Sequence, residues 1–168
     1  HCKFEAKTTF MKTVNPLAQD LDHVLKHTQP LWEELRGQRI FITGGTGFFG
    51  CWLLESFAWA NDKLGLNASA LVLTRNPEPF CAKAPHLASR PDIRFHIGDV
   101  RDFGFPQGSF SHVIHAANEE QAKASEQNLL RRFEIVLEGT RRTVEFARQC
   151  GARKFLLTSS GAIYGRQP

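Results

Sequence analysis

The sequence has no apolar run close to the roughly 20 residues that an α-helix needs to cross a bilayer. It also has no internal repeat and no low-complexity tract. Its 168 residues are 42% hydrophobic and 23% charged, a balance typical of a soluble globular protein that buries a core of its own. We therefore predict one domain with no membrane partner.

Cysteines and charges are spread rather than clustered. The four cysteines are Cys2, Cys51, Cys81 and Cys150. They contain no C-x-x-C pair, so neither a metal knuckle nor a disulfide framework is indicated, and a reducing, cytoplasmic setting fits. The net charge of +4 is not massed in one stretch, so we expect no nucleic-acid partner. His23 and His27 are one helical turn apart, but no Cys, Asp or Glu set completes a tetrahedral metal site.

The N-terminal part precedes the regular pattern of the chain. Residues 1–14 show neither apolar periodicity nor the layout of a signal peptide, and they are left unassigned. For residues 15–38 we predict an extension of two short helices, the first capped by Asn15 and the second started by Pro30. The first helix carries an apolar stripe of Leu17, Leu21, Val24 and Leu25.

A glycine-rich stretch, residues 43–50, organises the remainder of the chain. It joins the apolar run 39–42 to the apolar residues 52–58, so we predict a turn between a buried strand and a helix. Three of its four glycines, Gly44, Gly47 and Gly50, have the spacing G-x-x-G-x-x-G. Such glycines permit a tight turn, a close approach of backbone to a pyrophosphate, and close packing of helix on strand. The helix N-terminus favours a phosphate, although a glycine-rich turn without a ligand would show the same spacing.

Four more apolar runs lie at residues 70–74, 93–97, 112–116 and 154–158. Short continuous runs of this kind are typical of parallel strands buried on both faces. They alternate with helices or helix-length connections. This alternation predicts an α/β fold with a doubly wound, Rossmann-like parallel sheet in three layers over residues 39–168. We expect the strand order 3-2-1-4-5 and a ligand at the switch point between the first and fourth strands.

The connections are predicted less sharply. We expect the helix after the glycine turn to end near Ala60, with residues 61–69 forming a loop. Residues 76–92 contain four prolines, so no long helix is expected there. The clearest helix lies between the fourth and fifth runs and is capped by Gly151. Its apolar positions are Leu129, Phe133, Val136, Leu137, Thr140, Val144 and Ala147.

Five motifs in a fixed order carry a family resemblance. They are residues 43–50 (TGGTGFFG), 98–102 (GDVRD), 113–117 (VIHAA), 138–140 (EGT) and 158–165 (TSSGAIYG). Together they resemble the NAD(P)-dependent epimerase/dehydratase branch of the extended short-chain dehydrogenase/reductase family. The resemblance spans residues 39–165 and implies a nucleotide-sugar substrate, an NAD or NADP cofactor, and a homo-oligomer.

The resemblance implies a cofactor site at the strand ends. Its residues are Gly44, Gly47, Phe48, Phe49, Gly50, Arg75, Asp99, Val100, Ala116 and Ala117. Asp99 resembles the residue that accepts a hydrogen bond from the adenine amino group, with Val100 beside the ring, but an aspartate that closes a turn would look the same. Ala116 and Ala117 resemble the small residues that let the cofactor lie across the strands, with core packing as the alternative. We interpret His115 as core packing.

The choice between NAD and NADP depends on the end of the second strand. That strand ends without a carboxylate for the ribose 2′-hydroxyl of NAD. Arg75 lies there instead, and its positive charge slightly favours NADP, which carries a 2′-phosphate. A solvated loop arginine is an equal alternative.

The catalytic residues are only partly present. Ser160 occupies the position of the family's catalytic Ser/Thr, which hydrogen-bonds the substrate hydroxyl, or it only ends a strand. The family works through Tyr-x-x-x-Lys, in which the lysine lowers the pKa of the tyrosine base. The only tyrosine here is Tyr164, and Pro168 stands four residues later. We therefore expect a cofactor-binding part, truncated before the catalytic pair and the substrate subdomain, that does not turn over alone.

The expected activity is epimerisation by transient hydride transfer, or a related keto-sugar reduction. Dehydratases of this family carry Asp-Glu where this chain has Gly161 and Ala162, so a 4,6-dehydratase is disfavoured. A non-catalytic NAD(P)-binding module or regulator is the alternative. Relatives dimerise through the long helix and the catalytic helix, so we expect Leu129, Phe133 and Val136 to be uncovered here.

Overall fold

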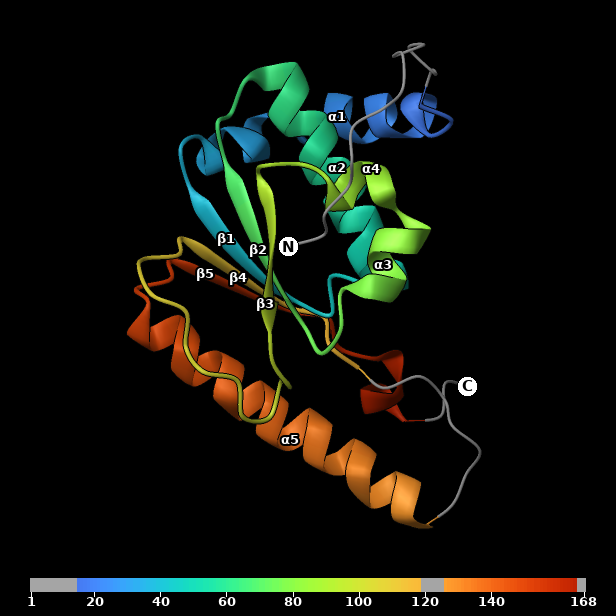
Figure 1. Cartoon of the computed structure of the whole chain (residues 1–168), viewed down its shortest axis with the longest axis vertical. Helices are drawn as coiled ribbons and strands as arrows, with labels where there is room; N and C mark the ends of the chain where they lie inside the picture. Colours follow the sequence, from blue (N-terminus) through green and yellow to red (C-terminus); the bar gives the residue numbers. More distant parts are fainter. Residues whose placement is uncertain (1–14, 119–125, 166–168) are drawn as a thin grey trace.

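The five apolar runs form one parallel sheet (Figure 1). The computed structural model describes residues 15–118 and 126–165, and its strands lie in the order β3-β2-β1-β4-β5 with every neighbouring pair parallel. The strands are β1 (Arg39–Thr43), β2 (Ser69–Thr74), β3 (Ile93–Ile97), β4 (His112–His115) and β5 (Lys154–Leu157). The predicted class and strand order are confirmed. The unassigned residues 1–14 lie outside the described ranges.

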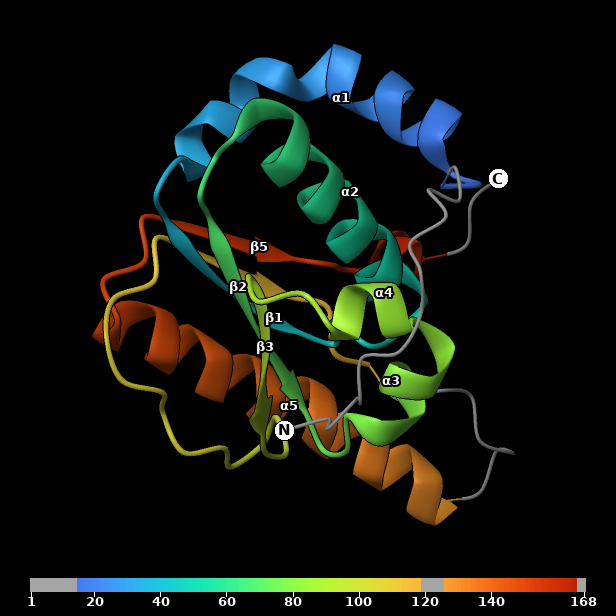
Figure 2. The same ribbon diagram turned by 45° about the horizontal axis from the view of Figure 1, so that its top comes forward.

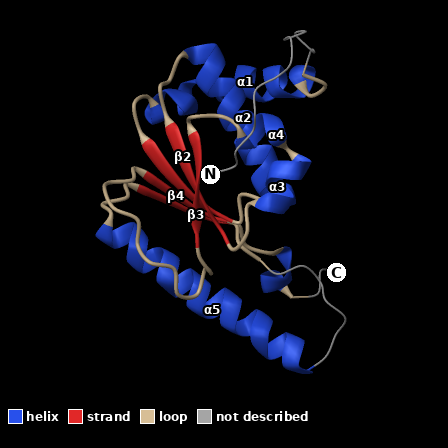
Figure 3. Cartoon of the chain, viewed as in Figure 1, coloured by secondary structure: helices blue, strands red, loops and turns tan. Residues whose placement is uncertain are grey.

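Helices lie on both faces of the sheet, which gives three layers (Figure 3). The described helices are α1 (Ala18–Trp32), α2 (Phe48–Leu64), α3 (Glu78–Lys83), α4 (Pro85–Ala88) and α5 (Glu126–Gln149), with 3-10 turns η1 (Glu33–Leu35) and η2 (Gly161–Tyr164). Figure 2 shows α2, α3 and α4 on one side of the sheet, with α1 outside α2, and α5 on the opposite side. No helix among these described residues has the length and apolar character to cross a membrane.

Each face of the sheet has its own apolar core, because successive residues of β1 point to opposite sides. Ile40 and Ile42 belong to the core under α2, whereas Phe41 belongs to the core under α5. The Phe41 ring lies with its centroid 4.6 to 5.8 Å from three other buried rings, those of Phe103, Phe110 and Phe146. This aromatic cluster fixes α5 against the centre of the sheet.

The N-terminal extension contains one α-helix, not two. α1 continues through Pro30, and η1 follows it directly. The Thr28 hydroxyl donates to the Val24 carbonyl at 2.6 Å and accepts from the Trp32 indole N–H at 2.8 Å. These side-chain bonds brace the turn in which the proline supplies no N–H. The predicted restart at Pro30 is therefore wrong.

The helix after the glycine turn is longer than predicted. α2 runs to Leu64 instead of ending near Ala60, and Gly65, with φ of 57°, closes it in the left-handed region. The buried Asn61 side chain donates to the Ala68 carbonyl and accepts from the Ala68 N–H. Asn61 therefore ties the last turn of the helix to the start of β2, so it extends the helix rather than breaking it.

The remaining helices follow the predictions more closely. Residues 76–92 form only the short helices α3 and α4. α5 meets the sheet with Ile135, Gly139, Thr143, Phe146 and Ala147, all of them buried. The predicted apolar stripe lies mostly on the opposite, exposed face, where Phe133 is 63% and Val136 54% exposed. The expectation that these two are uncovered is confirmed, and the Leu129 side chain lies outside the described part.

Candidate functional site

The turn between β1 and α2 is the first part of the candidate site. Gly44 has φ of 70°, and a Cβ there would overlap the backbone of Ala116 and Ala117. A Cβ on Gly50 would overlap the backbone of Gly44 and Gly45. The fold itself therefore requires both glycines, the first for the approach of the β4 end and the second for the packing of α2 on the turn.

Gly47 differs from Gly44 and Gly50, because the residues around it leave nearly enough room for a side chain. Its φ is −79°, and among the described residues an added Cβ would meet only the Gly44 carbonyl oxygen, at 3.3 Å. Gly47 is exposed and directly precedes α2, whose first turn has no side-chain cap and no acidic residue. The free N–H groups and the positive end of the helix make this position suitable for an anion. The lack of a Cβ leaves the outer side of the turn open.

Phe48 and Phe49 begin α2, and their rings do not enter the core. The side chains are exposed, with the ring centroids 5.5 Å apart in an edge-on contact. The helix nevertheless places their backbone N–H groups in its first turn, beside the glycines. Any phosphate contact from these two residues therefore comes from the backbone.

The end of β4 lies directly against the glycine turn. The Ala116 N–H donates to the Thr43 carbonyl at 3.1 Å, and the Ala117 N–H donates to the Thr43 hydroxyl at 3.3 Å. β1 and β4 are the strands at which the strand order reverses, which is where open α/β sheets bind ligands. The half-buried Ala116 and Ala117 thus lie at the switch point, as predicted.

Asp99 and Val100 follow β3 at the same end of the sheet. The Asp99 carboxylate accepts from the Arg101 guanidinium at 2.8 Å and from the Arg101 N–H at 3.0 Å. The hydrogen bond from the guanidinium is the main reason that the pKa of Asp99 lies below its ordinary value. Asp99 therefore does close a strand-end turn, and its ionised oxygens retain lone pairs for a further donor. Val100 is buried, and a Cβ on Gly139 of α5 would lie 2.9 Å from it.

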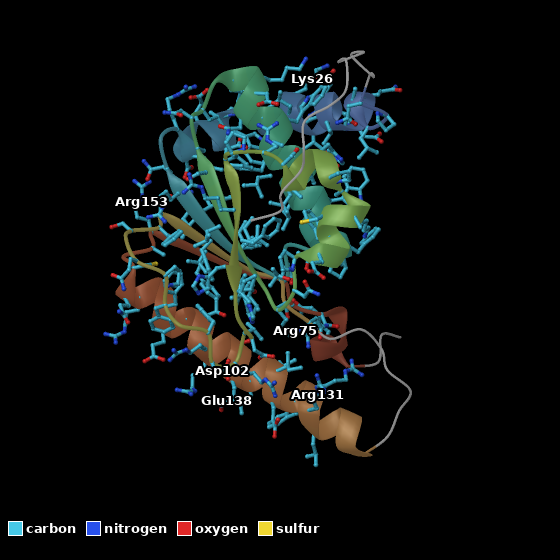
Figure 4. All side chains as sticks on the ribbon, in the orientation of Figure 1. Lys26, Arg75, Asp102, Arg131, Glu138 and Arg153 are labelled. Carbon is cyan, nitrogen blue, oxygen red and sulfur yellow. The ribbon has the colours of Figure 1, made fainter. Side chains whose placement is uncertain are left out.

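Arg75 is exposed one residue beyond β2 (Figure 4). Its positive charge also lowers the pKa of Asp99, so the two side chains share the carboxyl end of the sheet. The last residue of the strand, Thr74, donates its hydroxyl to the Asn76 carbonyl at 3.1 Å and offers no charge. Arg75 is therefore the charged group at the end of β2.

Ser160 and Tyr164 follow β5, on the other side of the switch point. The Thr158 N–H donates to the His115 carbonyl at 3.0 Å, so the segment leaving β5 stays beside the end of β4. Ser160 is exposed just beyond it, and Tyr164 is 76% exposed in η2. The serine thus lies at the same end of the sheet as the glycine turn.

The sequence did not predict a chain of hydrogen bonds behind this surface. The imidazole Nδ1 of His115 lies 2.6 Å from Thr43 Oγ1, and its Nε2 lies 3.1 Å from Thr140 Oγ1. Burial lowers the pKa of His115 to about 4, so the ring is neutral at physiological pH. The interpretation of His115 as a core residue is right about its burial, but it does not include the two hydrogen bonds with threonine hydroxyls. The available signal was a polar residue at the end of an apolar run that was expected to form a buried strand.

Other regions offer weaker alternatives. No group of three or more His, Cys, Asp or Glu side chains within the described ranges is placed to hold a metal. A shallow cavity of about 240 Å³ lies at the amino end of the sheet, lined by residues that include Arg39, Arg94 and Phe110. Open α/β sheets bind ligands at the opposite, carboxyl end. We therefore assign the candidate site to the glycine turn and the neighbouring strand ends.

Comparison with known proteins agrees with this geometry. The model of the NAD dependent epimerase/dehydratase family matches residues 40–168. The chain belongs to this family. Members of the family are NAD-dependent epimerases and dehydratases, and the matched residues include the glycine turn and every strand end described above.

Individual relatives are similar at moderate identity. dTDP-L-rhamnose 4-epimerase of Burkholderia thailandensis is 29% identical over 138 residues, covering 77% of this chain and 36% of that protein. CDP-glucose 4,6-dehydratase of Salmonella typhimurium is 27% identical over 121 residues, covering 69% and 32%. The Bordetella bronchiseptica enzyme WbmF, solved in complex with NAD+, shares the fold with a TM-score of 0.60 at 19% identity, covering 77% of this chain and 38% of that one. The chain spans about a third of the length of the curated relatives it matches.

Proposed function

We propose that this chain is the cofactor-binding part of a nucleotide-sugar epimerase that uses NAD or NADP for transient hydride transfer. The observation that carries the proposal is the glycine turn, residues 43–50, closed against Ala116 at the switch point. The N–H groups of the first turn of α2 would hold the pyrophosphate, and Gly47 would admit it. The Asp99 carboxylate would accept from the adenine amino group. When bound, the nicotinamide would supply the group that accepts a hydride from the sugar and returns it.

The substrate class comes from the family and the relatives, and we extend it to this protein. The Ser160 hydroxyl would hydrogen-bond the reacting sugar hydroxyl. Gly161 and Ala162 follow it, and neither can transfer a proton. This favours epimerisation or keto reduction over 4,6-dehydration, although one relative is a dehydratase.

Separate calorimetric titrations of NAD and NADP into the purified chain test the proposal. We expect saturable binding of at least one dinucleotide, and no binding of either would overturn it. We also propose a slight preference for NADP, because Arg75 is the charged group at the end of β2. Arg75→Ala should then weaken NADP binding and leave NAD binding unchanged; equal loss of both would contradict this assignment.

A second candidate function is a non-catalytic NAD(P)-binding module. The one tyrosine among the 168 residues, Tyr164, has Pro168 four residues later, so these residues alone do not distinguish the module from the enzyme. The coding sequence beyond Pro168 discriminates the two candidates. A Tyr-x-x-x-Lys motif there supports the enzyme, and an immediate stop codon supports the module.

We also propose that the protein acts as a homo-oligomer in the cytoplasm. The exposed apolar face of α5, which includes Phe133 and Val136, supports self-association. Cys51 and Cys150 are thiols, which suits a reducing compartment. The spread charge of +4 gives no reason to propose a nucleic-acid partner, and salt-sensitive retention on DNA would contradict that view.

A further inference from the structure

Three segments far apart in the sequence meet at one buried point behind the candidate site. His115 at the end of β4 lies between Thr43 of β1 and Thr140 of α5, with ring nitrogen to hydroxyl distances of 2.6 and 3.1 Å. The His115 side chain is 2% exposed, so it cannot touch a ligand bound at the surface. Each of the three residues comes from a different family motif, and Thr140 belongs to the motif at residues 138–140.

The contacts of His115 with the two threonines fit one assignment of the ring proton. Thr43 Oγ1 accepts from the Ala117 N–H at 3.3 Å, and we assign its hydroxyl as the donor to His115 Nδ1. With Nδ1 accepting, the ring proton is assigned to Nε2, which donates to Thr140 Oγ1. The chain therefore runs without a break from the Ala117 N–H to the Thr140 hydroxyl, and both ring nitrogens are satisfied.

This chain of hydrogen bonds is connected to the candidate site in two places, at the glycine turn and on α5. Thr43 directly precedes Gly44, and Ala117 directly follows the residue whose backbone a Cβ on Gly44 would overlap. The hydrogen bonds thus join two backbone segments that lie too close together for a Cβ on Gly44. On the helix, Gly139 precedes Thr140 and packs on Val100, next to Asp99. The same turn of α5 therefore supports both the glycine turn and the end of β3.

We propose that His115 is a positioning residue for the dinucleotide, which transmits the placement of α5 to the glycine turn and to the end of β4 through Thr140 and Thr43. The inference rests on the proposed function, because it needs a dinucleotide at that turn. Without the bond to α5, the turn and the β4 end gain freedom to separate. The N–H groups that face the pyrophosphate then lose their fixed spacing, so affinity falls although no ligand contact has been removed.

A set of threonine variants separates positioning from general stability. Thr140→Val keeps the shape of the side chain and removes the hydroxyl, whereas Thr140→Ser restores the hydroxyl. Thr143→Val is the matched control, because the fully buried Thr143 hydroxyl, further along the same helix, bonds the Gly139 carbonyl at 2.7 Å and lies outside the chain. Affinities are measured by calorimetry with NAD and NADP, at a temperature where every variant is folded.

We expect Thr140→Val to weaken dinucleotide binding about five- to tenfold, the loss that corresponds to one hydrogen bond. Thr140→Ser and Thr143→Val should each stay within about twofold of the parent chain. Equal affinities for Thr140→Val and Thr143→Val, or no rescue by serine, would overturn the proposal.

Hydrogen exchange without ligand gives a second measurement. The Gly47 N–H bonds the Gly44 carbonyl at 3.1 Å within the turn, and the Ala117 N–H bonds Thr43. Both amides should exchange faster in Thr140→Val than in Thr143→Val, and equal rates would count against the inference. If the parent chain binds neither dinucleotide, the proposed function fails, and the exchange rates alone decide whether this hydrogen-bond chain holds the turn.

Discussion

Gly47 offers the narrowest test of the candidate site at the scale of single residues. In Gly47→Ala the new methyl group meets the Gly44 carbonyl oxygen at 3.3 Å and no other atom of the described ranges within 4 Å, and the φ of −79° suits alanine. The free energy of unfolding should therefore change by less than about 1 kcal/mol. The same methyl group would lie where the pyrophosphate approaches, so dinucleotide affinity should fall at least about tenfold. Urea unfolding and calorimetry measure the two effects.

Two other glycines serve as controls for that variant. Gly104→Ala should change neither stability nor binding, because nothing lies within 4 Å of its added Cβ. Gly44→Ala should lower the free energy of unfolding by about 2 kcal/mol or more, because its φ of 70° and the backbone of Ala116 both oppose a Cβ. Unchanged binding in Gly47→Ala would contradict the placement of the pyrophosphate at this turn.

His115 makes stability depend on pH. Burial lowers its pKa from an ordinary value of 6.5 to about 4. Between these values the unfolded chain binds more protons than the folded chain, so stability is complete above pH 6.5 and is lost as the pH falls toward 4. This residue accounts for a loss of about 3 kcal/mol.

Urea unfolding at a series of pH values measures this dependence. The slope between pH 4 and 6.5 should be shallower in His115→Gln than in the parent chain. His112 contributes in the same direction, because burial and the nearby Lys154 and Arg153 lower its pKa too. It is present in both proteins, so the difference between their slopes belongs to His115. Equal slopes would show that His115 does not titrate as described.

At the scale of elements, α5 serves the core with one face and exposes the other. Phe146 is 1% exposed within the aromatic cluster, so Phe146→Ala should lower the free energy of unfolding by about 4 kcal/mol, measured by urea unfolding.

Phe133 lies on the exposed face of α5 and is 63% exposed, so Phe133→Asp should change the stability of the monomer by no more than about 0.5 kcal/mol. The same variant should weaken self-association, measured by light scattering at rising concentration. A parent chain that stays monomeric at high concentration would contradict the proposed oligomer.

The N-terminal extension behaves as an integral part of the domain. Leu21 of α1 is 1% exposed, and the Trp59 indole of α2 donates to the Asp22 carboxylate at 2.9 Å. Leu21→Ala should therefore lower the free energy of unfolding by about 3 kcal/mol. Leu31 in the same helix is 64% exposed, and Leu31→Ala should change it by less than about 0.5 kcal/mol. Similar changes in the free energy of unfolding for the two variants, measured with urea, would show that α1 does not contribute to the stability of the domain.

At the scale of the whole molecule, the sequence predicts the sheet because burial on both faces leaves a local pattern. Ile40, Phe41 and Ile42 are all buried, two toward α2 and one toward α5, so β1 reads as an uninterrupted apolar run. Right-handed crossovers leave few strand orders, and the glycine turn marks the central strand. The positions of the glycine turn and of Ala116 follow from the same reasoning. The ligand contacts assigned to Asp99 and Ser160 remain predictions.

Features that depend on distant contacts could not be predicted in this way. α2 passes its expected end because Asn61 bonds Ala68 and because the Arg36 guanidinium donates to the Leu64 and Gly65 carbonyls. Periodicity found an apolar stripe on α5, but it could not tell which face meets the sheet. The bonds of His115 join three separate segments, and no local pattern contains them.

The order of the strands also has a kinetic consequence. In the part of the chain that the structure describes, no neighbouring pair of strands is a hairpin: Ala70 pairs with Ile93, whereas Ile40 pairs with both Ala70 and His112. Loop-closure entropy opposes each pairing before its hydrogen bonds form, and it grows with the length of chain enclosed. We therefore expect the contact of β1 with β4 to close last among the pairings of β1. The glycine turn meets Ala116 only in that step, so the proposed dinucleotide site is complete only after β1 and β4 have paired.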